Sequence, residues 1–195
     1  TSTAIFGILN GLDASQRPSI PLRGLLRDTK HELRRDAPDQ GLALSEVRAL
    51  DGALPGAQGV ISTGLSFAVT AQLPGRAERV PARLVPGTFG SFFGIAPQAG
   101  RWIAGDDDHV GASQVVVISD RIWREWFGSR DDVVGRASIR INLASFTIVG
   151  VAAAGLRLPG DRYGSCDVWM PFASLSVIAP DRAAGSERLL TTSVL

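Results

Sequence analysis

Residues 115–128 read VVVISDRIWREWFG, and they predict the best-defined unit of the fold. Val115–Ile118 is a run of β-branched residues typical of a buried strand. Ser119 is suited to cap the N-terminus of a helix over residues 120–127. Gly128 then provides the left-handed residue that ends such a helix. The stretch therefore predicts a strand followed directly by a short helix.

The predicted helix has one apolar face. Its large apolar side chains fall at positions i, i+1, i+4 and i+5, and they are Ile122, Trp123, Trp126 and Phe127. Arg121, Arg124 and Glu125 face water on the other side. We therefore interpret both tryptophans as core residues rather than as a platform for ligand stacking.

Short strands and turns surround this unit. Alternating or β-branched runs predict strands at residues 60–61, 67–71, 80–85, 136–142, 146–151, 167–171 and 188–195. We interpret 167–171 as an edge strand because it ends in a proline. A short helix is expected at residues 46–50, and a turn-rich junction at 89–97 because of its glycines. The pattern indicates a mixture of helix and strand.

Composition excludes several classes of function. The chain has 195 residues and a formal net charge of +1, so its net charge gives no electrostatic attraction that would favour nucleic-acid binding. Cys166 is the only cysteine, which excludes an internal disulfide and any multi-cysteine metal site. The sequence also lacks the phosphate-binding, dinucleotide-binding, zinc-protease and serine-hydrolase motifs. It predicts no catalytic residue, no cofactor and no metal.

The first 43 residues differ from the rest of the chain in composition. Residues 4–12 form an apolar run too short to span a bilayer, and we interpret residues 1–12 either as a short buried segment or as the end of a transmembrane helix. Residues 13–43 carry a run of charges and few aromatic residues, which is typical of a solvated linker.

The run Asp106-Asp-Asp-His109 is the one candidate for metal chemistry. Three carboxylates and an imidazole can bind Ca²⁺, Mg²⁺ or Zn²⁺, but adjacent residues on an extended chain point in alternating directions. The alternative is a polar loop in which one aspartate caps a turn and the others are solvated. We favour the polar loop and keep a metal-binding or metal-dependent hydrolase module as the alternative.

Several motifs together resemble a known family. They are Thr88–Pro97, Gly100–Asp108, Val115–Trp123, Phe127-Gly128, Val134–Arg136, Phe146–Val151 and Asp167–Pro171. In order and spacing they resemble the extracytoplasmic core domain of MacB-type, FtsX-like ABC transporter permeases, from about Leu44 to Leu175. The chain departs from the family at Asn142-Leu143, where an Asn-Gly turn is common.

The resemblance implies an α+β fold of two small mixed α/β lobes, a porter-like lobe with a second lobe inserted into it. By analogy, residues 44–97 and 188–195 belong to the porter-like lobe, which is expected to be incomplete, and 98–180 to the inserted lobe. Ten motif residues are then expected to be structural: Gly100, Arg101, Asp107, Ser119, Trp123, Phe127, Gly128, Gly135, Gly150 and Trp169. Gly100 would permit a backbone bend, and Arg101 would bridge carbonyls or a carboxylate between the lobes.

The resemblance also implies a function. It predicts a non-catalytic periplasmic domain on the extracytoplasmic face of the cell membrane, which transmits conformational change from cytoplasmic ATP hydrolysis to substrate efflux or to partner proteins. The implied partners are a second copy of the permease, a cytoplasmic ATP-binding subunit and a periplasmic adaptor protein, with no nucleic acid. Candidate contact surfaces are the aromatic cluster of Phe89, Phe92 and Phe93 and any exposed tryptophan, although core packing is the favoured use of each. An adhesion or scaffolding domain that kept the fold is a further alternative.

Overall fold

The computed structural model describes residues 26–27, 60–62, 65–109, 111–156, 166–180 and 192–194. The apolar run at residues 4–12 and the helix expected at 46–50 lie outside these ranges. Within them, no helix is long and apolar enough to cross a membrane.

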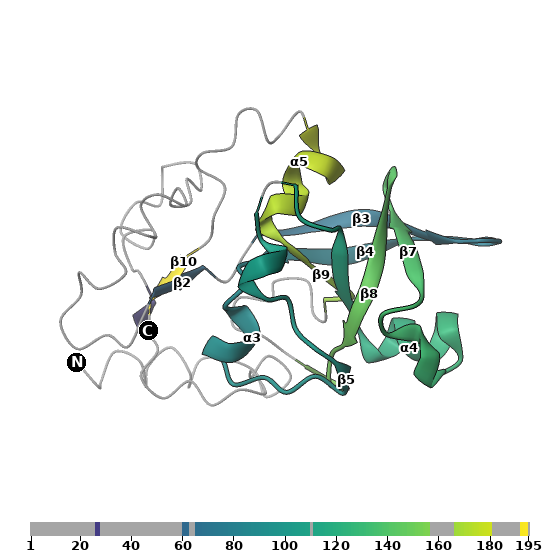
Figure 1. Cartoon of the computed structure of the whole chain (residues 1–195), viewed down its shortest axis with the longest axis horizontal. Coiled ribbons are helices and arrows are strands. Elements are labelled where there is room, and N and C mark those ends of the chain that lie inside the picture. The colour runs from purple at the N-terminus through teal and green to yellow at the C-terminus, as the bar shows by residue number, and fades with distance from the viewer. Residues whose placement is uncertain are drawn as a thin grey trace, which may run out of the picture.

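Most of the described strands belong to one mixed sheet (Figure 1). Its order is β5-β8-β6-β9-β4-β3-β7, and β7 also pairs with β8, so the sheet curls back on itself. The strands are β3 (Leu65–Leu73), β4 (Arg76–Val85), β5 (Ala99–Gly100), β6 (Val115–Ile118), β7 (Ser138–Ile141), β8 (Ala144–Val151) and β9 (Val168–Pro171).

Short helices connect the strands. They are α3 (Phe89–Phe92), α4 (Asp120–Phe127) and α5 (Leu175–Ile178), with single 3₁₀ turns η3 (Gly105–Asp107), η4 (Asp131–Val133) and η5 (Phe172–Ser174). β6 and α4 occupy the ranges that the sequence predicts. The junction at residues 89–97 holds a single helical turn, as its glycines indicate.

A second, small sheet has the order β1-β10-β2 and is antiparallel throughout. Its strands are β1 (Leu26–Arg27), β2 (Val60–Ser62) and β10 (Thr192–Val194). β2 covers the strand predicted at 60–61, and β10 is the described part of the strand predicted at 188–195. The two strands pair with each other, and two residues of the expected linker pair with β10.

The prediction that residues 167–171 form an edge strand is wrong. β9 lies inside the sheet, parallel to β4 on one side and antiparallel to β6 on the other. All four of its residues are buried. Pro171 is the last residue of the strand, and the pairing with β6 covers only Val168 and Trp169, so on that side no ladder hydrogen bond requires its missing N–H.

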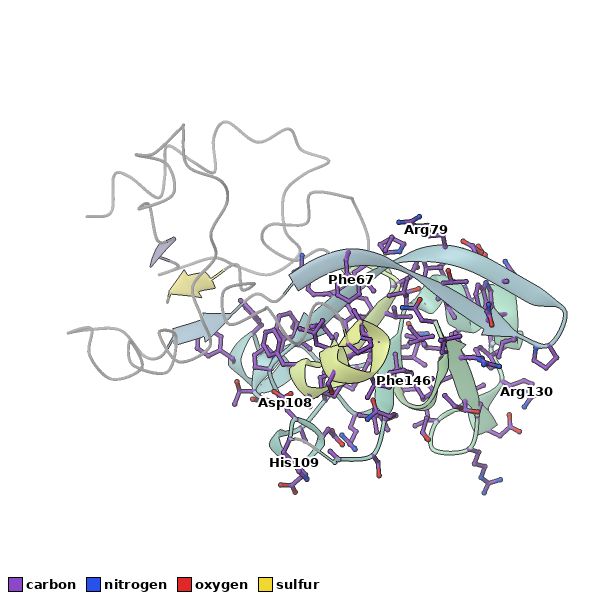
Figure 2. All side chains as sticks on the ribbon, turned by 90° about the horizontal axis from the view of Figure 1, so that it is seen from above. Phe67, Arg79, Asp108, His109, Arg130 and Phe146 are labelled. Carbon is purple, nitrogen blue, oxygen red and sulfur yellow. The ribbon has the colours of Figure 1, made fainter. Side chains whose placement is uncertain are left out.

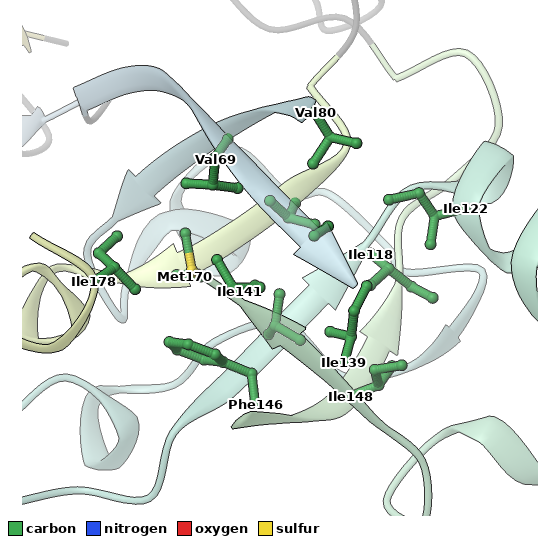
Figure 3. Packing of buried hydrophobic residues seen from close by; sticks show 14 of the residues in the cluster. Val69, Val80, Ile118, Ile122, Ile139, Ile141, Phe146, Ile148, Met170 and Ile178 are labelled. Atoms are coloured by element: carbon green, nitrogen blue, oxygen red, sulfur yellow. The ribbon is translucent and has the colours of Figure 1, made fainter. Parts of the chain in front are cut away.

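The large sheet has an apolar core on each face. Successive residues of a strand point to opposite faces, and Val168 and Met170 enter one core while Trp169 enters the other. Figure 3 shows the first core, where Val69 and Val80 from the β3–β4 hairpin meet side chains of β6, β7, β8 and β9. The second core is built around Phe89, Trp102 and Trp169.

The shared sheet crosses the expected lobe boundary at residue 97. Ala71 and Gln72 of β3 pair with Ile141 and Arg140 of β7, and four residues of β4 pair with β9. Residues 65–85 therefore share hydrogen bonds and a core with residues 98–180.

The backbones of β5 and β8 approach so closely that two glycines are required. Gly100 pairs with Gly150, and Arg101 N donates to Val149 O over 2.9 Å. A Cβ on Gly150 would clash with the Arg101 carbonyl oxygen, and a Cβ on Gly100 would clash with that of Val149. Gly100 also has a positive φ of 72°, which L side chains rarely adopt.

We expect Gly150→Ala to lower the free energy of unfolding by about 2 kcal/mol, because the new methyl group forces β5 away from β8. Gly105→Ala is the matched control, since a Cβ there meets no atom within 4 Å. Chemical denaturation measures both variants. Equal stability of the two would show that the strand pair tolerates the methyl group.

Candidate functional site

Arg101 and Asp107 form a two-point ion pair at the end of β5. The Arg101 guanidinium donates from Nη1 to Asp107 Oδ2 at 2.5 Å and from Nη2 to Oδ1 at 2.9 Å. Arg101 Nη1 also donates to the Trp102 carbonyl at 3.0 Å, and Ala104 N donates to Asp107 Oδ2 at 2.7 Å. The pair therefore fixes the turn that carries η3.

The environment of Asp107 keeps its carboxylate ionised. The hydrogen bond from Arg101 lowers the pKa of Asp107 below its usual value, against the opposing effect of desolvation, and the same bond raises the pKa of Arg101. Both carboxylate oxygens are engaged, and the Asp107 side chain is only 10% exposed. Such a carboxylate is suited to holding a turn, and it is poorly suited to proton transfer near neutral pH.

The other residues of the Asp106–His109 run do not converge with Asp107. Asp106 and His109 are exposed, and Asp108 Oδ1 accepts a hydrogen bond from Ala173 N at 2.9 Å. Figure 2 shows Asp108 and His109 on a loop at the periphery of the domain. Across the described residues, no three His, Cys, Asp or Glu side chains are grouped so that they could hold a metal ion.

The Arg101 contacts are local. Its carboxylate partner Asp107 and its carbonyl partner Trp102 both follow it within six residues of the chain. Arg101 was expected to bridge the two lobes, but the contacts of its side chain lie within the segment 98–180.

A second ion pair joins the start of α4 to the start of β9. Ser119 accepts a hydrogen bond from Ile122 N at 3.2 Å, as an N-cap does, and its hydroxyl donates to Asp167 Oδ1 at 2.7 Å. Arg121 donates to both oxygens of Asp167, at 3.1 and 2.7 Å. Asp167 is buried, and its hydrogen bonds raise the pKa of Arg121 further above its usual range.

Charges from the β3–β4 hairpin extend this pair. Arg121 also contacts Glu78 and Glu125, each at 3.1 Å. Arg76 donates to the Glu125 carbonyl at 3.1 Å, and its guanidinium lies 4.7 Å from the centre of the Trp126 ring. The network of Arg76, Glu78, Arg121, Glu125 and Asp167 thus holds α4 against both β4 and β9.

Besides Ser119, three of the predicted structural residues lie on or beside α4. Trp123 is half-buried and its indole Nε1 donates to the Arg130 carbonyl at 2.9 Å. Phe127 packs against the first core. Gly128 ends the helix in the left-handed conformation, with its N–H donating to the Arg124 carbonyl at 3.1 Å.

The remaining predicted residues lie elsewhere. Gly135 donates from its N–H to the Ile148 carbonyl at 2.7 Å, which secures the approach to β7. Trp169 is buried in the second core, where its ring meets that of Trp102 edge-on at 5.6 Å. The structure therefore brings Gly100, Arg101, Asp107 and Gly150 together and places Ser119 at a separate cluster.

Sequence reasoning missed Arg121 and Asp167 as partners. They are 46 residues apart, and neither lies in a motif that pairs an arginine with a carboxylate. The signal available was an aspartate placed directly before a buried strand. The aromatic cluster takes part in core packing, its favoured use, since Phe89 is buried and Phe92 and Phe93 are half-buried against the second core.

Comparison with known proteins identifies the family. Residues 1–193 match the sequence model of the family described as the MacB-like periplasmic core domain. No individually curated protein matches the sequence significantly.

Solved structures share the fold at low sequence identity. The periplasmic region of MacB from Actinobacillus actinomycetemcomitans is 17% identical, with a TM-score of 0.64 over 89% of this chain and 77% of that one. The extracellular domain of the noncanonic ABC-type transporter YknZ from Gram-positive bacteria is 16% identical, with a TM-score of 0.61 over 81% and 74%.

We expect Arg101→Ala to lower the free energy of unfolding by about 1 kcal/mol at neutral pH, because Arg101 is half exposed and solvent weakens the pair. Arg124→Ala, which breaks the more exposed Arg124–Asp120 pair, is the control and should cost less. Unchanged stability in Arg101→Ala would contradict the structural role of the pair.

The same pair predicts a pH dependence. The folded-state pKa of Asp107 is below its usual value of 3.8, so the stabilisation is present above pH 3.8 and is lost as the pH falls through the folded pKa. Denaturation curves from pH 7 downward should show the difference between wild type and Arg101→Ala shrinking only below about pH 4. A difference that shrinks already between pH 7 and 5 would assign the effect to another group.

We further expect Arg121 and Asp167 to be coupled by about 1–2 kcal/mol in a double-mutant cycle of Arg121→Gln and Asp167→Asn, because the aspartate is buried and bound at both oxygens. The exposed pair Arg124–Asp120 provides a control cycle, with an expected coupling of about 0.3–0.5 kcal/mol. Coupling no larger than in the control would show that the buried pair does not hold α4 in place.

Proposed function

Since the chain belongs to the family of MacB-like periplasmic core domains, we propose that it transmits conformational change between cytoplasmic ATP hydrolysis and efflux or partner proteins. The family places the chain on the extracytoplasmic side of the cell membrane, as a domain of an ABC transporter permease.

One observation carries this proposal. β2 and β10 are adjacent, antiparallel strands of the small sheet, with Ser62 opposite Thr192, and the whole large sheet lies between them in sequence. A unit inserted between two paired strands is tied to the rest of the protein at neighbouring points. It can therefore be displaced as a whole when the small sheet moves.

The large sheet is suited to move as a rigid body. β7 pairs with both β3 and β8, apolar cores fill both faces, and the charge network around Arg121 fastens α4 to β4 and β9. Packed interiors resist continuous deformation, so a force applied at one edge is transmitted across the unit. We place the lobe division between β2 and β3, with residues 65–180 as the inserted lobe and β1, β2 and β10 in the porter-like lobe.

We propose that the domain itself is non-catalytic. The two buried aspartates of the described region, Asp107 and Asp167, are each bound by an arginine at both oxygens. This supports a structural role for them. Nothing in the family or in the related structures points to the alternative of a metal module at Asp106–His109.

The partners follow from the family. Domains of this kind belong to ABC transporters, which work with a cytoplasmic ATP-binding subunit. We propose that two copies of the permease form a homodimer and that a periplasmic adaptor protein is a further partner.

The test uses the complete permease with its ATP-binding subunit and spin labels on cysteines. Thr147 on β8 and Arg124 on α4 are both exposed and suit labelling. We expect the distance between Thr147 of the two protomers to differ between the nucleotide-free and ATP-bound states, and the distance from Thr147 to Arg124 within one protomer to stay constant. Electron double resonance measures both.

Two results would overturn the proposal. Distances that stay the same in both states while ATP is hydrolysed would mean that the domain does not move with the cycle. A change within one protomer as large as the change between protomers would mean that the unit is not rigid. A hydrolysis-deficient ATP-binding subunit serves as the control for nucleotide state.

A further inference from the structure

The turn between β7 and β8 presents an isolated apolar side chain to solvent. Leu143 is 86% exposed, and Val177 of α5, at 40%, is the other large apolar residue exposed in the described part of the chain. A leucine so exposed adds little to folding stability, because burial of its side chain is what stabilises.

Hydrogen bonds nevertheless hold this turn rigidly. Asn142 adopts a left-handed φ of 52°, its N–H donates to the Thr70 carbonyl at 2.8 Å, and its Oδ1 accepts from Thr70 N at 3.1 Å. Its Nδ2 donates to the Ile178 carbonyl at 3.0 Å, which ties the turn to α5 beside Val177. The hydrogen bonds of Asn142 therefore fix the backbone at Leu143, although the Leu143 side chain is almost fully exposed.

The sheet next to the turn has an outward face that is basic. Gln72 pairs with Arg140, Arg140 pairs with Ser145, and Thr70 pairs with Arg79. Figure 2 shows Arg79 at the outer surface of the β3–β4 hairpin. The exposed positions of β3, β4, β7 and β8 on this face carry no carboxylate: they are Ala68, Thr70, Ala77, Arg79, Ser138, Arg140, Ser145 and Thr147, and Gln72 beside them is half-buried.

Arg79 and Arg140 are free to bind a partner. Neither forms an ion pair or a side-chain hydrogen bond with any described residue, whereas Arg76, Arg101, Arg121, Arg124 and Arg130 are all paired with carboxylates. Thr70, which pairs with Arg79 across the strands, also bonds to Asn142, so both arginines lie within two ladder positions of the turn.

We propose that Leu143, Val177, Arg79 and Arg140 form a docking surface for a protein partner that offers an apolar pocket rimmed by carboxylates. Interfaces of this kind combine a central apolar anchor with arginines, which bind carboxylates at two points. A lipid surface fits less well, because one rigid leucine and one half-exposed valine offer little area for insertion. The proposal stands on these contacts and does not depend on the rigid-body movement.

The first experiment is photo-crosslinking in cells that express the complete permease. Leu143→p-benzoylphenylalanine tests the turn, and Arg124→p-benzoylphenylalanine on α4 is the exposed control position. We expect Leu143 to yield an adduct with another extracytoplasmic protein, mapped by mass spectrometry to a segment with apolar and acidic residues. The control position should not yield this adduct.

Charge reversal then tests the two arginines of the docking surface. Arg79→Glu with Arg140→Glu should reduce the adduct by about tenfold, because each reversal replaces an attraction to a carboxylate with a repulsion. Arg130→Glu, an exposed arginine paired with Asp132, is the matched control and should leave the adduct unchanged. Exchange of the mapped partner carboxylates for arginine should restore it.

Several results would overturn the proposal. They are no adduct at Leu143, an adduct only with lipid or with a second copy of this chain, or a protein adduct that the charge reversals do not reduce. Thermal unfolding of each variant shows whether a lost adduct reflects a lost fold, and Leu143→Ser provides a second variant that removes the apolar anchor at an exposed position.

Discussion

The pairing of β9 with β4 and β6 is the contact on which the rest of the domain depends. β9 runs parallel to β4, with Ala82 opposite Val168, and antiparallel to β6, with Ile118 opposite Val168. It thereby joins the β3–β4 hairpin to the strand–helix unit of β6 and α4. Because side chains alternate along β9, one strand supplies both the Met170 core and the Trp169 core.

The same strand organises the charges. Asp167 directly precedes β9, where it meets Ser119 at the N-cap of α4 and Arg121 in the first turn of that helix. A buried carboxylate without a partner would cost several kcal/mol, so the position of α4 is fixed by the need to pair Asp167. Arg101 and Asp107 act in a similar way at the other end of the sheet.

These features support the proposed roles of the domain in movement and docking. Asp107 and Asp167, the buried aspartates of the described region, hold a turn and a helix against strands. Leu143, Arg79 and Arg140, by contrast, stand at the surface without a described partner of their own.

The sequence by itself determined the local elements and the family. The β-branched run Val115–Ile118, the cap at Ser119 and the stop at Gly128 set β6 and α4 at their observed ends, because these signals act within a few residues. Only the tertiary structure decided which strands are neighbours. Pro171 suggested an edge strand, but β9 is buried inside the sheet. The pairing of Asp167 with Arg121, 46 residues away, had no local sequence pattern. Both depend on burial across the whole sheet, which a local pattern does not record.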